Sequence, residues 1–359
     1  MSTPREELNR LIAGFWTTQA IYVAVRLRVP DLLANGPRTA DELARESGAH
    51  PRSLYRLLRA LASSGVFHED AEHRFALTPL SECLRSDAPA SMAAISWMRG
   101  DWQYRAWGNL LHNVQTGETA FDHLFGESLF EFLGHTPENA AIFDQGMVGV
   151  HGRETEAMLT AFDFSNIEVL ADIGGGNGSV LAAVLTKHPS LRAILFDRAD
   201  VIDRAKANLA QAGVADRVQF IAGDFFQSVP RGADAYFLRH IIHDWNDDQS
   251  RTILNNVRSA MPPDGRLLLA EFVLPDGPEP FHGKWFDVAM MTVTGGQERT
   301  ASEYRKLLEA SRFTLQHIVP TATELSVIEA TCSMTPIAAH LSVPDVSVSS
   351  AESPFVTER

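Results

Sequence analysis

The stretch from Glu168 to Gly178 constrains the fold of this chain more than any other segment. It is an apolar run that ends in closely spaced glycines, Glu-Val-Leu-Ala-Asp-Ile-Gly-Gly-Gly-Asn-Gly. The apolar run predicts a buried strand over 169–173, and a helix is expected from about residue 179 to 187. Between them, the glycines permit a tight turn whose backbone can approach a ligand. The helix amino terminus offers unpaired N–H groups to a carboxylate or phosphate.

The glycine spacing departs from the G-x-G-x-x-G dinucleotide fingerprint, because Ser179 stands where its last glycine would be. A second apolar run ends in Asp197, where a carboxylate at a strand end can accept hydrogen bonds from both hydroxyls of a ribose. A third run leads into Asp224 and Phe225, which offer a carboxylate for an exocyclic amine and an aromatic face for an adenine. The repeated pattern favours a nucleoside-type ligand over a purely structural turn.

Apolar runs and helical segments alternate through the second half of the chain. Strands are expected at 169–173, 193–197, 218–222, 234–238 and 266–272, with helices at 179–187, 200–212 and 248–260. Such alternation predicts a parallel sheet with helices on both faces. Ligands bind beyond the carboxyl ends of its strands.

Five ordered motifs resemble those of the S-adenosylmethionine (SAM) methyltransferases, specifically the small-molecule O-methyltransferases related to plant caffeate and isoflavone enzymes and to bacterial polyketide-tailoring enzymes. The motifs are Asp172–Gly178, Gly223–Phe226, Arg239–Trp245, Ala270–Phe272 and Gly295–Thr300. The resemblance covers nearly the whole chain. It implies an α/β fold, in which an α-helical winged-helix dimerisation domain precedes a Rossmann-like SAM-methyltransferase domain with a mostly parallel seven-stranded sheet.

The resemblance also implies SAM as the methyl donor, with no metal. The residues expected to contact SAM are Asp172, Gly174, Gly175, Gly176, Gly178, Asp197, Asp224, Phe225 and Arg239. We expect a helical and winged-helix dimerisation domain over residues 1–90, a helical linker and substrate-pocket region over 91–154, and the catalytic domain over 155–332. The tail 333–359, rich in Ser, Val and Pro, is expected to be disordered.

From Arg5 to Arg28, apolar residues recur at helical spacing around much of the circumference. A helix of this kind needs burial on more than one side. One partner would be the body of the same chain and the other a second subunit, since the resembling family uses its first helices to form an interlocked homodimer. An ordinary core helix is the alternative.

The next segment predicts a winged helix-turn-helix. Thr39 and Glu42 have the capping-box spacing, a second helix is expected over 51–64, and 66–77 is expected to form a hairpin. Three arginines on the second helix would suit DNA: Arg52, Arg56 and Arg59. No basic arm flanks them, and the resembling family uses this module for dimerisation and substrate enclosure.

Residues 91–150 are dense in aromatic side chains, some of which are expected to wall a flat apolar pocket. The resemblance places Met147, Asp244 and Met290 near the methyl acceptor, although both methionines could equally be plain core. Thr294 stands where the plant enzymes commonly have proline, in a segment one residue shorter than theirs. The shape of the pocket, and with it the acceptor, therefore stays open.

His243, expected just after the fourth strand, is the candidate general base. Imidazole titrates near physiological pH, so a neutral ring can take the proton of an acceptor hydroxyl, which matters for phenols with a pKa of about 10. Glu271 and Glu298 are expected to hold this base, because a carboxylate that accepts from one ring nitrogen fixes the tautomer. A structural histidine is the alternative, and His240 is expected to pack or to line the pocket.

These features predict a homodimeric SAM-dependent O-methyltransferase acting on a hydroxylated aromatic small molecule, such as a phenolic, quinone-derived or polyketide metabolite. SAM-binding hydroxylases or decarboxylases of polyketides are an alternative, although they lack the His-Asp-Trp arrangement. N-methyl transfer also stays open. A SAM-sensing winged-helix regulator that binds DNA is the alternative outside enzymes.

Composition bears on partners and location. The net charge of −14 argues against a nucleic-acid or anionic-membrane partner, since both reward clustered positive charge. Cys83 and Cys332 lie far apart and make no metal or redox motif, which fits a reducing compartment. Because the chain shows neither a secretion signal nor an apolar run of membrane-spanning length, we expect a cytoplasmic location.

Overall fold

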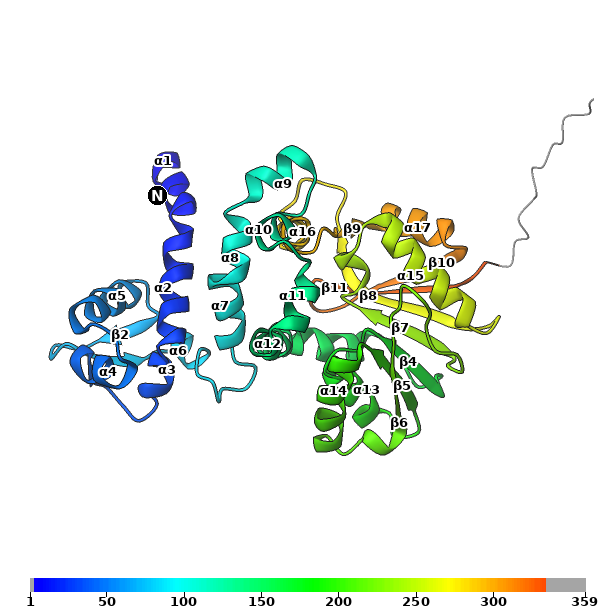
Figure 1. Ribbon diagram of the computed structural model, residues 1–359, viewed down its shortest axis with the longest axis horizontal. Helices are drawn as coiled ribbons and strands as arrows, with labels where there is room; N and C mark the ends of the chain where they lie inside the picture. Colours follow the sequence, from blue (N-terminus) through cyan, green and yellow to red (C-terminus); the bar gives the residue numbers. More distant parts are fainter. Residues whose placement is uncertain (1–2, 334–359) are drawn as a thin grey trace, which may run out of the picture.

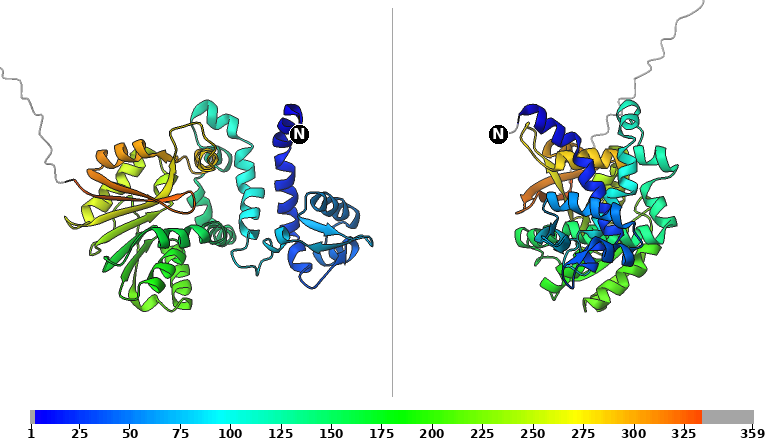
Figure 2. Two further views of the ribbon diagram at one scale, coloured as in Figure 1. Left: turned by 180° about the vertical axis from the view of Figure 1, so that it is seen from behind. Right: turned by 90° about the vertical axis from the view of Figure 1, so that its left-hand side faces the viewer.

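The computed structural model describes residues 3–333, so nearly all of the tail expected to be disordered lies outside the described residues. Three parts follow one another along the chain: a small N-terminal domain, a group of helices, and a sheet with helices on both faces (Figure 1). Seen from behind, the long helix α2 stands between the small domain and the central helices (Figure 2).

The N-terminal domain surrounds a three-stranded antiparallel sheet of order β1-β3-β2 with helices. Its elements are α1 (Pro4–Ile12), α2 (Gly14–Arg26), α3 (Val29–Leu32), β1 (Arg38–Thr39), α4 (Ala40–Ser47), α5 (Pro51–Ser63), β2 (Phe67–Glu69), β3 (Arg74–Leu77) and α6 (Pro79–Glu82). The predicted capping box is confirmed, because Thr39 and Glu42 each accept a hydrogen bond from the other's backbone N–H. Helix, helix and hairpin follow in the predicted winged-helix order.

The prediction of one helix over 5–28 is wrong in its continuity. The chain forms two helices, α1 and α2, which meet at Ala13 and Gly14, where glycine weakens helix propagation. No residue of α1 is buried, and Leu11 and Trp16 are 62% and 65% exposed. An ordinary core helix is therefore excluded for α1, and this apolar surface has the character of a contact site.

The central helices connect the two domains. They are α7 (Ala93–Gly100), α8 (Trp102–Trp107), α9 (Leu110–Thr116), α10 (Ala120–Phe125), α11 (Leu129–His135) and α12 (Pro137–Ala161). Trp102 and Phe121 are buried in their shared core. Helix α12 continues through the boundary we expected at 154/155, so the central helices and the catalytic domain share one rigid element.

The catalytic domain contains a sheet of order β10-β11-β8-β7-β4-β5-β6, with β9 added beside β8. Its strands are β4 (Val169–Ile173), β5 (Arg192–Asp197), β6 (Val218–Ala222), β7 (Ala235–Arg239), β8 (Arg266–Leu274), β9 (Arg299–Thr300), β10 (Phe313–Pro320) and β11 (Leu325–Cys332). Its helices are α13 (Ser179–Lys187), η1 (Ala215–Arg217), α14 (Ala199–Gln211), η2 (Ile242–Asp244), α15 (Asp247–Ala260), α16 (Gly283–Val293) and α17 (Ala301–Ala310). The predicted strands and helices are confirmed to within about two residues at each end.

The sheet is mostly parallel, as predicted: β6, β5, β4, β7 and β8 run together, and only β11 and β10 pair in the antiparallel sense. Leu170 belongs to the core on one face and Ala171 to the core on the other. A strand buried on both faces has no polar alternation, which explains the continuous apolar run in the sequence. The carboxyl ends of β4, β5 and β7 share one edge, so the segments that follow them converge there.

Within residues 3–333, we find no helix with both the length and the apolar character needed to span a bilayer.

Candidate active site

A large cavity of about 870 Å³ opens at the carboxyl edge of the parallel strands. Its lining includes eight of the nine residues predicted to contact SAM: Asp172, Gly174, Gly175, Gly176, Asp197, Asp224, Phe225 and Arg239. Gly178, the ninth, lies just below the cavity, where a Cβ would come within 2.8 Å of Leu209. Gly178 therefore serves close packing at the start of α13 rather than the cavity wall.

The glycine turn has the backbone that its sequence predicts. Gly174, Gly176 and Gly178 have φ values of 74°, 57° and 76°, in the left-handed region that disfavours side chains. A Cβ on Gly176 would meet no atom within 4 Å, although this residue lines the cavity. The space beside Gly176 is thus open to a ligand that approaches the main chain.

Two of the carboxylates that line this cavity are Asp172, which is buried, and Asp197, which is half-buried. No hydrogen bond from a described residue reaches the Asp172 carboxylate, and burial, aided by the charge of Asp197, raises the pKa of Asp172 to about 7. Asp197 Oδ2 accepts from Gly176 N at 2.8 Å and Oδ1 from Arg198 N at 2.7 Å. Each oxygen of Asp197 retains a lone pair for a ligand hydroxyl. The pair suits a ligand rich in donors or carrying positive charge, and a cationic sulfonium nucleoside has both features.

One end of the first cavity is aromatic. Phe225 and Phe226 meet the Trp245 ring edge to face, with ring centroids 5.9 and 4.7 Å away. Asp224 lines the same region, and its Oδ1 accepts from Phe226 N at 2.8 Å. A flat ring bound here would lie beside aromatic side chains and a carboxylate, and contact of Asp224 and Phe225 with an adenine stays a prediction.

A second cavity of about 470 Å³ adjoins the first. Both are lined by Phe143, Met147, His240 and Asp244, so these side chains form the boundary between the two spaces. The second is also lined by Tyr104, Trp107, Trp285, Phe286, Met290, Thr294 and His243. All three predicted acceptor contacts, Met147, Asp244 and Met290, thus reach it, and most of its walls are aromatic or aliphatic.

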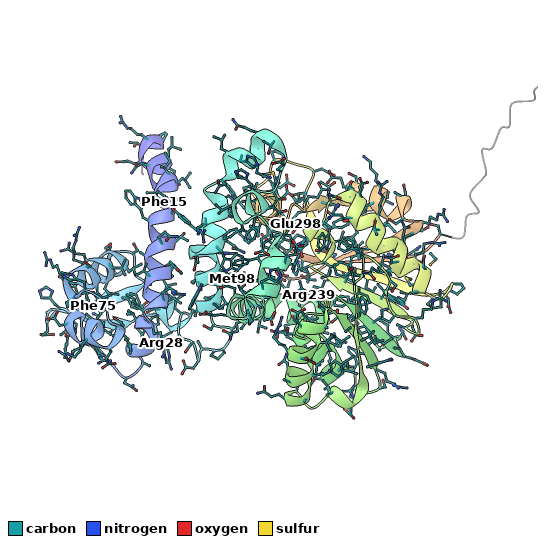
Figure 3. All side chains as sticks on the ribbon, viewed as in Figure 1. Phe15, Arg28, Phe75, Met98, Arg239 and Glu298 are labelled. Atoms are coloured by element: carbon teal, nitrogen blue, oxygen red, sulfur yellow. The ribbon has the colours of Figure 1, made fainter. Side chains whose placement is uncertain are left out.

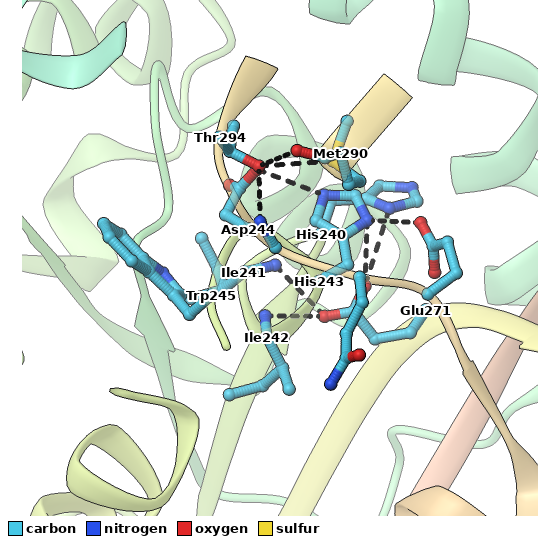
Figure 4. A network of polar contacts seen from close by, with 12 residues as sticks. His240, Ile241, Ile242, His243, Asp244, Trp245, Glu271, Met290 and Thr294 are labelled. Atoms are coloured by element: carbon cyan, nitrogen blue, oxygen red, sulfur yellow. Dashed lines mark hydrogen bonds and ion pairs between the residues drawn. The ribbon is translucent and has the colours of Figure 1, made fainter. Parts of the chain in front are cut away.

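His243 lies in η2, and its ring is almost completely buried. Its Nδ1 lies 2.7 Å from Glu298 Oε1, a charge-assisted hydrogen bond from imidazole to carboxylate. Figure 4 shows His243 with its neighbours Asp244 and Glu271. With Nδ1 bonded in this way, Nε2 is the atom left to accept a proton. Nε2 has Asp244 Oδ1 at 3.8 Å.

Glu271 holds the base differently from Glu298. Its Oε1 accepts hydrogen bonds from Ile241 N and Ile242 N at 3.1 and 2.9 Å, which fixes the main chain that carries His243. Its Oε2 lies 3.5 Å from His243 Nδ1, beyond normal hydrogen-bond length. Glu298 therefore orients the ring, whereas Glu271 anchors its backbone and adds negative charge beneath it.

These carboxylates change the proton affinity of the base. Burial alone would lower the pKa of His243, but the charges of Glu298, Glu271 and Asp244 outweigh it and raise the pKa to about 10. Burial raises the pKa of Glu271 to about 7 and that of Asp244 to about 6, against the opposing charge of His243. The imidazole is consequently more basic than an ordinary histidine.

Three residues that place Glu298 have no role in our sequence analysis. A Cβ on Gly296 would lie 2.0 Å from His243 O, so only glycine lets this turn lie against η2. Arg299, 1% exposed, donates to Ile242 O and Trp245 O at 3.1 and 2.9 Å, and Asp287 Oδ1 accepts from Glu298 N at 2.8 Å. Gly296 and Arg299 belong to the Gly-Gly-Gln-Glu-Arg-Thr motif, which is the signal for them, whereas Asp287 lies outside it on α16.

Arg239 and His240 form a second network through a residue that the sequence analysis missed. Glu154, on α12, accepts from Arg239 Nη2 at 3.0 Å and lies 2.9 Å from His240 Nε2. Arg239 and Glu298 both lie at the edge of the catalytic domain that faces the central helices (Figure 3). Arg239 lines the first cavity, but its guanidinium is engaged with α12, so it ties that helix to the site. No sequence motif marks Glu154.

Side-chain donors of His240, His243 and Glu271 lie within 4.8 Å of one another, which is close enough for a metal ion. His243 Nδ1 is however bonded to Glu298, and Glu271 Oε1 to the main chain. The expected absence of a metal stays a prediction.

The chain matches known proteins along most of its length. An O-methyltransferase domain model matches residues 107–314, and an O-methyltransferase dimerisation domain model matches residues 9–87. The chain is 46% identical over 323 residues to phenazine O-methyltransferase PhzM of Lysobacter antibioticus, covering 90% of this chain and 95% of that protein. It is 37% identical to 8-amino-8-demethylriboflavin N,N-dimethyltransferase of Streptomyces davaonensis, covering 86% and 90%.

Solved structures share this fold over most of the chain. The crystal structure of NcsB1, an O-methyltransferase from neocarzinostatin biosynthesis in complex with SAM and 2-hydroxy-5-methyl naphthoic acid, superposes with a TM-score of 0.80 at 32% identity. It covers 88% of this chain and 96% of that one. Together with the glycine-lined cavity and the buried imidazole beside it, these matches show that the chain belongs to the family of SAM-dependent O-methyltransferases.

Proposed function

We propose that this protein transfers the methyl group of SAM to a hydroxyl of an aromatic small molecule, with His243 as the general base. The observation that carries the proposal is the 2.7 Å contact between His243 and Glu298 at the wall of an aromatic cavity that adjoins the glycine-lined one. Relatives named for phenazine and naphthoic acid ligands support an aromatic acceptor.

The cofactor residues divide the work between main chain and side chains. Asp172 and Asp197, with the turn at Gly174–Gly176, would hold the polar parts of SAM, while Asp224 and Phe225 would hold its base. SAM supplies a methyl group on a positively charged sulfur, which makes that carbon electrophilic.

In the transfer step, His243 Nε2 takes the proton of the acceptor hydroxyl as the oxygen attacks, and Nδ1–H stays bonded to Glu298. The carboxylates that raise the pKa of His243 make the ring a stronger base toward a phenol, whose pKa is about 10, than an ordinary histidine is. The positive charge of SAM, when bound in the first cavity, would disfavour the imidazolium form of His243 and so favour the neutral ring before transfer.

The proposal is tested by offering the purified protein isotope-labelled SAM with a panel of phenols, hydroxynaphthalenes, hydroxyphenazines and matched arylamines. Mass spectrometry should find the label on an aromatic oxygen of at least one compound. Label on nitrogen alone would favour the second reaction, N-methyl transfer, which the N,N-dimethyltransferase relative also performs according to its name. Transfer to no panel member, with SAM bound, would contradict the proposal.

We also propose a homodimer formed through α1 and the start of α2. The support is the match to a dimerisation domain and the apolar side chains left exposed on these helices: Leu8, Leu11, Ile12, Phe15 and Trp16. Replacing Leu11 and Trp16 with aspartate should convert the two-chain species to one chain, because burying two carboxylates in an apolar interface is costly. Light scattering coupled to size exclusion measures the mass. Leu80→Asp, an exposed apolar residue on α6, is the control and should remain dimeric.

Location and other partners remain inferences. Cys83 and Cys332 are free thiols, which fits our prediction of a cytoplasmic protein. The expectation of no nucleic-acid or membrane partner rests on the net charge of −14.

A further inference from the structure

The second cavity contains one permanently charged cation. Arg99, near the end of α7, lines it together with Tyr104, Trp107 and Phe143. The other walls are largely aromatic or aliphatic, so this exposed guanidinium offers a ligand in the cavity a cationic partner beside apolar surface. We therefore asked what this side chain binds.

Arg99 has no counter-ion among the residues that the structure describes. No carboxylate lies within 4.0 Å of its guanidinium, and no hydrogen bond or aromatic stacking contact involves it. Two other arginines, Arg105 on α8 and Arg26 on α2, do have aromatic partners: Arg105 lies over the Phe125 ring and Arg26 over the Trp97 ring. Arg99 is an exposed residue, although enough protein surrounds its guanidinium for partial burial to lower its pKa.

The same cavity is negatively charged at its catalytic end. Asp244 lines it, and Glu271 and Glu298 lie directly behind the His243 ring. An anionic group on an acceptor would be repelled from that end and attracted to Arg99. One cation and several carboxylates, placed on different elements of one cavity, can therefore orient a molecule that has a hydroxyl at one end and an anion at the other.

We propose that Arg99 binds a carboxylate of the methyl acceptor, so that the substrate class is the hydroxylated aromatic acids. This rests on the proposed function and adds the charge of the substrate to it. The planar guanidinium matches a carboxylate in a two-pronged geometry, and the aromatic walls would hold the ring in the cavity that Arg99 and His243 both line. Gln103, which lines the same cavity, offers a further amide donor.

The test uses pairs of acceptors that differ only in charge, such as a hydroxynaphthoic acid and its methyl ester. Binding is measured by calorimetry in the presence of S-adenosylhomocysteine, and turnover by labelled SAM. The wild-type protein should prefer the acid by about 10- to 100-fold in affinity, the scale of one charge-assisted pair. Arg99→Gln should remove this preference by weakening the binding of the acid alone, mainly as a higher KM. Arg99→Lys should retain part of the preference. Arg105→Gln, which changes a guanidinium outside the cavity, should leave the preference intact.

Other outcomes overturn the proposal. Equal losses for acid and ester in Arg99→Gln would mean that Arg99 stacks on the ring or supports the fold. A change in oligomeric mass with an unchanged acid preference would mean that Arg99 pairs with a second subunit. Methylation of esters and acids alike would refute it while the proposed function stood. Binding of acids through Arg99 without any methylation would support it and refute the proposed function.

Discussion

Replacing His243 with alanine is expected to lower kcat by about 10²- to 10⁴-fold, the usual contribution of a general base. The variant lacks Nε2, the atom to which we assign the proton. His243 does not line the first cavity, in which we propose that SAM binds. The dissociation constant for SAM should therefore change little. Single-turnover kinetics with labelled SAM, together with calorimetry for SAM, separate the two quantities.

His317→Ala is the control for this experiment, because His317 is exposed on β10, an edge strand of the sheet that is separated from β4 by β11, β8 and β7. It should leave both kcat and SAM affinity unchanged. If His243→Ala retains wild-type turnover, positioning of the two substrates alone drives transfer, and the assignment of a base is wrong. A large loss of SAM affinity would instead mean that the ring shapes the first cavity.

Glu298→Gln should lower maximal turnover by about 10²-fold or more and move its pH dependence. The amide removes the charge that holds the ring in one tautomer, and loss of the equivalent carboxylate charge in serine proteases costs about 10⁴-fold. His243 is active as the neutral ring, so turnover rises as pH passes upward through its pKa. Because Glu298 is the largest of the charges that raise that pKa, its removal should shift the rise to lower pH.

The measurement is a pH–rate profile of kcat for wild type and variant with the same acceptor, since the acceptor's own ionisation then cancels. Glu303→Gln is the matched control: Glu303 is exposed, five positions along the chain, and glutamine preserves its capping role at α17. A Glu298→Gln profile that rises at the same pH as wild type would contradict the proton affinity we assign to this cluster.

The order of elements could be predicted because it depends on local patterns. The run at Val169–Ile173 is apolar at every position but Asp172, and its glycines follow at once. Asp197 ends the next strand, and Asp224 comes two residues after the strand that follows. Parallel strands of this kind can only be buried on both faces, so their carboxyl ends and the residues after them had to share an edge. The break between α1 and α2 escaped prediction, since the apolar period runs on through Ala13 and Gly14.

The division of labour at the base could not be predicted in the same way. Glu271 and Glu298 are both glutamates near His243 in the motifs, and nothing in the sequence distinguishes the one that bonds Nδ1 from the one that bonds the main chain. Glu298 Oε1 lies 2.7 Å from His243 Nδ1 and Glu271 Oε2 lies 3.5 Å from it, so a difference of less than 1 Å in distance separates the two roles. Glu154 and Arg99 carry no motif at all, and they matter only because α12 and α7 pass the site.

The sequence by itself determined the fold class, because strand burial and glycine turns are properties of short segments, and its resemblance to the O-methyltransferases supplied SAM and the candidate base His243. Only the tertiary structure decided which side chains face one another across the second cavity and which carboxylate orients the base. Those relations join α7, η2, β8 and the turn before β9, segments as much as 200 residues apart, whose spacing is set by packing rather than by local preference.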